Sequence, residues 1–97
     1  MKDLTTTFKI NSAFQLTGRQ FYIIGDILSG IVKIGMIADL TEIGIEKSVV
    51  IETVEFALFR EDEEVGEEVG LGFSGITEAE KEVLKTKAPF ATAIRIR

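Results

Sequence analysis

Residues 14–36 read FQLTGRQFYIIGDILSGIVKIGM, and this stretch carries the clearest structural pattern in the chain. It places a Thr-Gly-Arg turn, an apolar run, a Ser-Gly turn and a Val-Lys-Ile-Gly segment in that order. Gly18 can take the positive φ that a tight turn requires, and Gly30 follows a serine that also favours turns. Residues 21–28 are apolar on both phases, which predicts a strand covered on both faces at least in part. The stretch therefore predicts successive strands of an antiparallel sheet.

Strand-like alternation continues on both sides of this stretch. Toward the N-terminus, one phase that runs from residue 8 into this stretch holds four large apolar side chains, those of Phe8, Ile10, Phe14 and Leu16. Downstream, alternation predicts strands at four places: residues 34–40, 48–58, 69–74 and 90–96. The apolar phase of residues 48–58 shifts midway, which predicts a β-bulge near Glu52 and Thr53.

A capping pattern predicts one helix. Residues 77–80 read Thr-Glu-Ala-Glu, so Thr77 and Glu80 can each accept the other's backbone N–H. The helix should reach about Thr86 and stop before Pro89. We expect one all-β domain over residues 1–97, a small six-stranded antiparallel β-barrel with a short helical turn near residues 77–86. Its expected core consists of Phe8, Ile10, Phe14, Phe21, Ile23, Ile37, Val54, Phe56, Val69, Leu71, Phe73, Phe90 and Ile94.

Composition limits the chemistry that this chain can perform. It is 45% hydrophobic and 28% charged with one proline, which is typical of a folded globular domain. It has no histidine and no cysteine, so imidazole-assisted nucleophiles, disulfides and the usual zinc ligands are excluded. The phosphate-loop pattern G-x-x-x-x-G-K-[ST] is also absent. We therefore expect no enzyme activity, no catalytic or metal site, no cofactor and no GTP binding by this chain alone.

The sequence also bears on localisation. No apolar stretch approaches the roughly 20 residues that a membrane span requires, and the first residues show no signal-peptide pattern. We expect a cytoplasmic protein with no membrane contact.

The net charge of −5 is unevenly distributed along the sequence. Residues 61–82 hold nine acids against one lysine and carry −8, whereas the remainder holds seven acids against ten basic residues and carries +3. A charged loop is predicted at residues 60–66, and its acidic run contains Glu61, Asp62, Glu63 and Glu64. These four residues are a candidate docking patch for a basic partner surface. The alternative is a solvated loop that keeps the barrel soluble.

Residues 14–36, together with the VGLGFSGI of residues 69–76, resemble the second domain of translational GTPases of the elongation factor Tu type. The resemblance covers residues 8–97 and implies the small β-barrel of that domain, here without the GTP-binding domain that it normally follows. In the family, this barrel helps to form a pocket for the terminal adenosine of aminoacyl-tRNA. Asn11 lies in the matching loop, Arg19 matches the arginine of the family's Gly-Arg-Gly, and Glu55 matches an acidic residue of the adenine site. The resemblance thus implies a ligand site at these three residues.

Arg19 and Glu55 also have purely structural interpretations. Arg19 can pair with a surface carboxylate, and Glu55 on the outer phase of a strand can simply be solvated. For the whole chain, we hypothesise a non-catalytic binding module that serves as a platform for a protein partner. The alternative is an RNA- or ribosome-associated domain that contacts tRNA 3′ ends or rRNA. RNA binding is expected to be weak, because one arginine cannot replace the several phosphate contacts of tight association.

Overall fold

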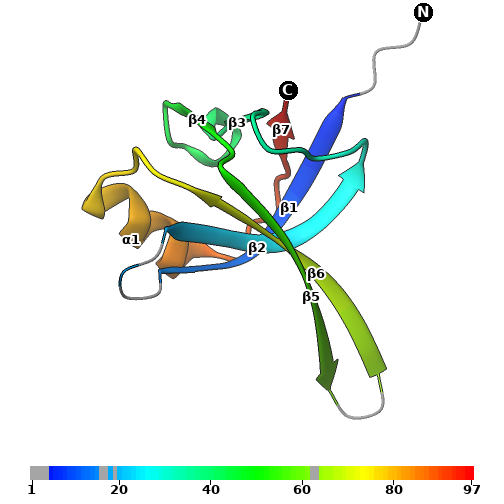
Figure 1. Cartoon of the computed structure of the whole chain (residues 1–97). Helices are drawn as coiled ribbons and strands as arrows, with labels where there is room; N and C mark the ends of the chain where they lie inside the picture. Colours follow the sequence, from blue (N-terminus) through cyan, green and yellow to red (C-terminus); the bar gives the residue numbers. More distant parts are fainter. Residues whose placement is uncertain (1–4, 16–17, 19, 62–63) are drawn as a thin grey trace, which may run out of the picture.

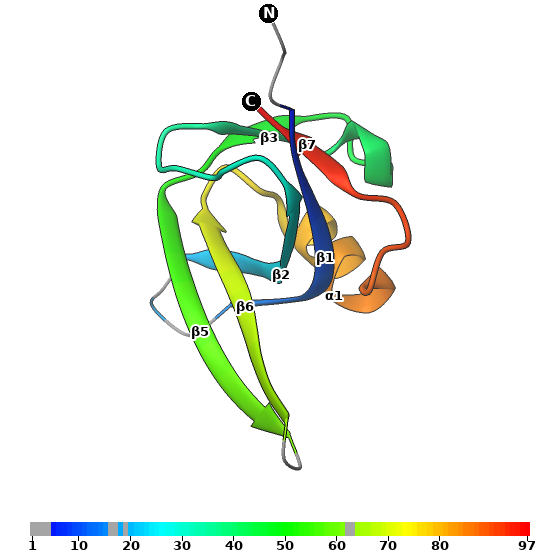
Figure 2. The same cartoon turned by 90° about the vertical axis from the view of Figure 1, so that its right-hand side faces the viewer.

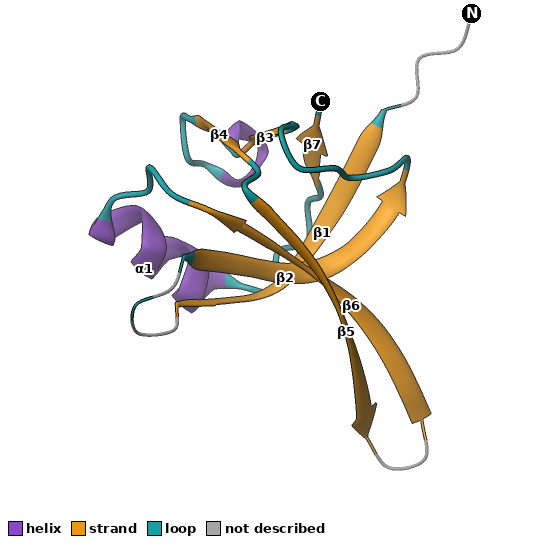
Figure 3. Ribbon diagram, viewed as in Figure 1, coloured by secondary structure: helices purple, strands orange, loops and turns teal. Residues whose placement is uncertain are grey.

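The computed structural model describes residues 5–15, 18, 20–61 and 64–97. These residues form one curled antiparallel sheet of seven strands, one α-helix and a short 3₁₀-helix (Figures 1 and 3). The strands follow one another across the sheet in the order β4 (Ser48–Val50), β3 (Ile37–Asp39), β7 (Ile94–Ile96), β1 (Thr6–Gln15), β2 (Phe21–Ser29), β6 (Glu64–Phe73) and β5 (Thr53–Glu61). The two helices are η1 (Thr41–Ile43) and α1 (Glu78–Lys87).

The first and last strands of this order, β4 and β5, follow one another in the chain, so the sheet curls back on itself (Figure 2). The change of pairing partner occurs between Ile51 and Glu52. The Ile51 N–H donates to the Met36 carbonyl beside β3, whereas the Glu52 N–H donates to the Gly72 carbonyl of β6, both at 2.8 Å. The predicted all-β, barrel-like antiparallel architecture is thereby confirmed.

The number of strands differs from the prediction. Residues 48–58, predicted as one strand, form β4 and the first part of β5, so the described residues contain seven strands and not six. The irregularity predicted at Glu52 and Thr53 is present at their junction. Thr53 lies opposite Gly72 in the register, and Glu52 also bonds to Gly72, so two residues face one as in a β-bulge. The continuous segment of residues 48–61 therefore supplies the edge strands at both ends of the sheet, β4 and β5.

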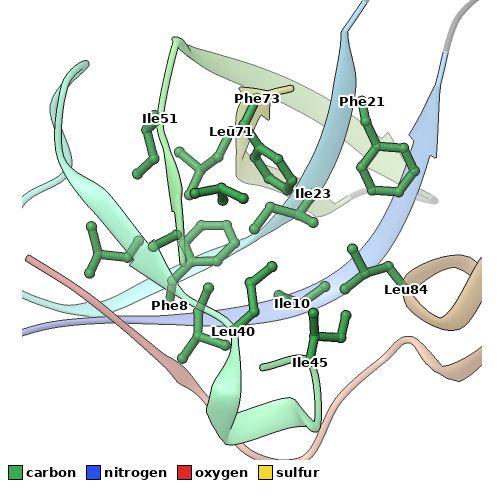
Figure 4. Close-up of a cluster of buried hydrophobic side chains, with 14 of the residues drawn as sticks. Phe8, Ile10, Phe21, Ile23, Leu40, Ile45, Ile51, Leu71, Phe73 and Leu84 are labelled. Carbon is green, nitrogen blue, oxygen red and sulfur yellow. The ribbon is translucent and has the colours of Figure 1, made fainter. Parts of the chain in front are cut away.

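The hydrophobic core fills the inside of the curl (Figure 4). Eight of the predicted core residues are buried, namely Phe8, Ile10, Phe21, Ile23, Val69, Leu71, Phe73 and Ile94. Ile37, Val54 and Phe90 are only half-buried. The core also contains residues that the sequence analysis did not name: Ala38, Leu40, Ile45, Val49, Ile51, Leu84 and Ile96. Most of these lie in short strands or connections, where alternation is too brief to reveal them.

Phe14 was predicted to be buried, and this is wrong, because its side chain is 37% exposed. The register between β1 and β2 shifts between Ile10 and Ser12. Ile10 faces the core before this bulge, but after it Ala13 packs against the core and Phe14 turns to the outside. An irregularity of one residue thus exchanges the two faces of the second half of β1.

Phe56 is also exposed, at 64%, contrary to the prediction. Its register partner is Val69, which is buried, so the predicted face of β5 is the right one. The β5–β6 hairpin, however, projects well beyond the body of the barrel (Figure 1). β2 pairs with β6 only as far as Val69, so Phe56 lies where the support from the rest of the sheet ends.

Three further element boundaries differ from the prediction. The strands expected at residues 34–40 and 90–96 are reduced to β3 and β7. Gly35 interrupts the first with a φ of 98°, and in the second the Phe90 N–H bonds to the Ile10 carbonyl at the β1 bulge. The charged loop expected at residues 60–66 is mostly strand, because β5 continues to Glu61 and β6 begins at Glu64.

The predicted capping box is confirmed at the start of α1. Thr77 has an extended backbone with φ −79° and ψ 162°. Its hydroxyl accepts the Glu80 N–H at 3.2 Å, and the Glu80 carboxylate accepts the Thr77 N–H at 2.9 Å. α1 then packs on β1 and buries Leu84 in the core.

We expect Thr77→Ala to lower the free energy of unfolding by about 1 kcal/mol, because the Glu80 N–H loses its acceptor. Urea denaturation followed by circular dichroism measures this change. Thr92→Ala, at an exposed threonine outside the helix, is the matched control and should leave the midpoint nearly unchanged. Equal midpoints for Thr77→Ala and wild type would contradict the stabilising role of the cap.

The Glu80 carboxylate also bonds to the Lys47 ammonium at 2.7 Å. This bond and the Thr77 N–H hold the pKa of Glu80 below its usual value of 4.5. Because the pKa is lower in the folded state, the stabilisation is complete above the usual value and is lost as the pH falls through the folded-state pKa. The stability advantage of wild type over Glu80→Gln should therefore shrink as the pH is lowered from about 6 to about 3.

Urea midpoints at several pH values measure this difference. Glu42→Gln, at an exposed glutamate of η1, is the control for the loss of one carboxylate. A difference between wild type and Glu80→Gln that stays constant over the pH range would contradict the role of the ionised Glu80.

Candidate functional site

One side of the sheet faces away from the core and carries linked side chains from β1, β2, β6 and β5. We call this surface the outer patch and define it by Asn11, Phe14, Tyr22, Asp26, Glu55 and Glu68. Contacts between strands join these residues into two groups, one centred on Tyr22 and one on Asn11. The predicted ligand residues Asn11 and Glu55 thus lie on one surface but in different groups. Arg19, the third predicted ligand residue, lies outside the described residues.

Tyr22 is the centre of the first group. It is only 5% exposed although it belongs to the outer face of β2. Its ring stacks on Phe14, with the centroids 5.8 Å apart and the planes at 19°. Its hydroxyl donates to a Glu55 carboxylate oxygen at 2.7 Å. Since β6 lies between β2 and β5, this bond reaches across β6 and fixes the Glu55 carboxylate in place.

Two glycines of β6 make room for this arrangement. Gly72 lies opposite Tyr22, and a Cβ on it would lie 2.9 Å from Tyr22 Cε1 and 3.1 Å from Thr53 Cβ. A Cβ on Gly70 would lie 3.1 Å from Ile24 Cδ1. Because Gly70 and Gly72 have no side chains, the side chains of Ile24 and Tyr22 on β2 can lie directly over the β6 backbone. Glycine within a strand often marks such a close approach.

Asn11 is the centre of the second group. Its side-chain nitrogen donates to the Asp26 carboxylate at 2.9 Å and to the Glu68 carboxylate at 3.2 Å. Its side-chain oxygen accepts from the Lys9 ammonium at 3.1 Å. The two carboxylates fix the orientation of the amide, because only the nitrogen can donate to them. Both ends of the Asn11 amide are thus engaged within the protein.

A further set of contacts forms a rim where β6 ends. The Gln20 amide donates to the Glu52 carboxylate and accepts from the Thr53 hydroxyl. The Ser74 hydroxyl donates to the same Glu52 carboxylate at 3.0 Å. These contacts hold the Glu52 side chain near Gly72, the residue paired with Tyr22.

The outer patch and this rim carry negative charge. They contain four carboxylates, those of Asp26, Glu52, Glu55 and Glu68. Among the described residues of this network, Lys9 is the one cation, so the sum is −3. The exposed face of Phe14 adds an accessible aromatic ring. Carboxylates beside an aromatic face suit a lysine or arginine side chain, by charge attraction and by a cation–π contact.

The structure describes the predicted acidic docking patch only in part. Glu61 and Glu64 face each other in the backbone register at the outer end of the β5–β6 hairpin. Asp62 and Glu63 lie outside the described residues. Glu61 and Glu64 therefore lie on the projecting β5–β6 hairpin, whose strands also carry Glu55 and Glu68 of the outer patch.

A hollow of about 320 Å³ opens at the α1 end of the barrel. Phe21, Phe73, Gln15 and Lys81 are among the residues that line it. The two phenylalanine rings meet edge to face, with their centroids 6.0 Å apart. The Lys81 ammonium already bonds to Gln15 at 2.9 Å and to Glu78 at 3.0 Å. Its charge is thus engaged by neighbouring side chains, and the hollow is a weaker candidate for an anionic ligand.

In the part of the chain that the structure describes, no group of three or more acidic side chains is placed to hold a metal ion. Nor does any helix in that part have the length and apolar character needed to cross a membrane.

Tyr22, Asp26 and Glu68 were not predicted from the sequence as ligand or docking residues. A signal was available in β2, because Tyr22 and Asp26 share the phase opposite to the buried Phe21 and Ile23. No comparable signal identifies Glu68, which lies among several other acids.

No family model matches the chain, and neither the curated proteins nor the solved structures that were compared with it gave a match. The function is therefore inferred from the outer patch, the charge pattern and the sequence resemblance.

We expect Gly72→Ala to destabilise the protein by about 1–3 kcal/mol, because the new methyl group must displace the Tyr22 ring. Gly70→Ala is the matched control with the smaller cost, since its Cβ would meet the flexible end of Ile24. Tyr22 is the one tyrosine and the chain has no tryptophan, so intrinsic fluorescence reports on this ring alone. Unchanged stability and fluorescence in Gly72→Ala would contradict the packing of Tyr22 over Gly72.

Proposed function

We propose that this protein is a non-catalytic binding module that docks a protein partner through a basic segment of that partner. The barrel is proposed to be of the kind found as the second domain of translational GTPases of the elongation factor Tu type. The sequence resemblance of residues 14–36 and 69–76 supports this assignment. The observation that carries the binding function is the outer patch, where carboxylates from three strands are fixed beside an exposed aromatic ring.

Fixed carboxylates favour binding because little side-chain freedom remains to be lost. A glutamate on an open surface loses rotamer entropy when a partner orders it. Glu55 is already held by the Tyr22 hydroxyl, and Asp26 and Glu68 are already held by one amide. Asp26 and Glu55 are exposed residues and Glu68 is half-buried, so negative charge at this surface can attract a cationic partner and increase the rate of association.

The RNA alternative has weaker support at this surface. Tight RNA association needs several cations that neutralise phosphates. In the outer patch, the Lys9 ammonium bonds to Asn11, and the Asn11 nitrogen donates to two carboxylates. Phosphates placed here would be repelled by Asp26 and Glu68. The RNA alternative therefore depends on the family resemblance at Asn11, Arg19 and Glu55.

We expect a synthetic peptide of alternating lysine and glycine, with four of each, to bind weakly at the outer patch. The affinity should fall as salt rises from about 50 to about 500 mM, because exposed charges are screened. Amide NMR shifts should centre on Asp26, Glu55 and Glu68, and Tyr22 fluorescence should change. An oligonucleotide ending in CCA should give no such shifts at physiological salt.

Glu55→Gln tests the charge directly. The glutamine side-chain oxygen can still accept from Tyr22, so the packing is retained while one negative charge is removed. Affinity for the basic peptide should drop about threefold, which corresponds to one exposed charge pair. Glu46→Gln, at an exposed position before β4, is the control and should not change affinity. No binding of the basic peptide, or tighter binding of the oligonucleotide at this patch, would contradict the proposed function.

A further inference from the structure

β5 is hydrogen-bonded to one neighbour. Its nine residues pair with β6 from Thr53 to Glu61. No strand in the described part of the chain pairs with its other edge, and β5 is the last strand in the sheet order. In an antiparallel ladder every second residue directs its N–H and C=O away from its partner. This edge therefore presents a row of backbone donors and acceptors, which is the template on which another strand can add.

The two faces beside this edge differ in chemistry. On the core side, Phe56 is 64% exposed, and Val54 two residues earlier is half-buried. On the outer side, Glu55 is held by Tyr22. A strand that added to β5 would direct alternate side chains to these two faces. Residues toward Phe56 would be apolar, and basic residues on the opposite face would be attracted by the net charge of −7 that residues 52–68 carry.

We propose that the open edge of β5 docks an extended segment of a partner protein in which apolar and basic residues alternate. The segment adds to the sheet as a further strand, with main-chain hydrogen bonds along β5 and its apolar side chains over Phe56. This inference rests on the proposed function and narrows it to one kind of partner segment and one edge of the sheet.

The charge of the hairpin favours a segment of another protein, and not a second copy of this chain, as the strand that adds to β5. Residues 52–68, which span the whole hairpin, contain eight acids and one arginine, so their net charge is −7. Pairing β5 with β5 of a second copy would bring two such segments together. Like charges across adjacent strands are destabilising, whereas a basic segment would be attracted.

Hydrogen exchange with two peptides of equal length and charge tests the docking mode. One alternates lysine with valine, the other lysine with glycine, with four of each residue. The lysine–valine peptide should protect β5 amides that are not bonded to β6, and it should bind about tenfold more tightly because its valines cover apolar surface. The lysine–glycine peptide should leave exchange in β5 nearly unchanged.

Two variants separate this inference from a contact by charge alone. Phe56→Ala should remove most of the preference for the lysine–valine peptide and leave the affinity for the lysine–glycine peptide unchanged. Leu28→Ala, at an apolar side chain of β2 that is 57% exposed, is the matched control and should change neither affinity. Because both side chains are largely exposed, both variants should fold, and circular dichroism checks this.

Several results would overturn the inference. Equal binding of both peptides without protection of β5 would leave the proposed function standing and reject strand addition. Protection confined to residues 64–68 would show that the peptide adds to the edge of β6 and not to that of β5. Protection of β5 without any peptide, together with a dimer in light scattering, would make a second copy the occupant. Binding of neither peptide would reject the proposed function together with this inference.

Discussion

The fold depends on how closely β1 can approach β2 at Gly25. A Cβ on Gly25 would lie 1.8 Å from the Lys9 carbonyl oxygen, a distance that no side chain could accept. Ile10 is paired with Gly25, and the next pair is Ser12 with Ile24, so the β1 bulge begins at this contact. There the Ile10 carbonyl accepts from the Phe90 N–H at 2.9 Å. The Ile10 carbonyl, at the start of this bulge, therefore connects the segment after α1 to the sheet.

The same bulge separates the core from the outer patch. Before it, Phe8 and Ile10 face inward, and after it the inward position passes to Ala13. Phe14 is therefore free to stack on Tyr22 outside the barrel. Had β1 continued without the bulge, Phe14 would face the core and the Tyr22 ring would lose its cover. The candidate site is in this sense a consequence of an irregularity in the scaffold.

Local and periodic features could be predicted from the sequence, whereas features set by neighbouring strands could not. The Thr77 cap and the alternation of Leu71 and Phe73 depend on residues close in sequence, and both predictions are confirmed. The β1 bulge has no glycine or proline of its own, and its signal lies fifteen residues away in Gly25. For Phe56, alternation predicted the face of β5 correctly but not the exposure, which depends on where β2 stops supporting β6. Asn11 and Glu55 were placed on one surface through a family resemblance, while their actual partners follow from the pairing of β1, β2, β6 and β5.

The bond between Tyr22 and Glu55 gives the projecting hairpin a fixed connection to the barrel. Adjacent strands lie about 4.8 Å apart, so a side chain of β2 that bonds to β5 must cross two such spacings. Gly70 and Gly72 allow this, because no side chain of β6 stands between Tyr22 and β5. The bond lies next to Phe56, near the point where the hairpin leaves the body of the barrel. A segment that binds along β5 would therefore meet a strand whose base is already ordered, and less of the interaction energy would be lost in ordering it.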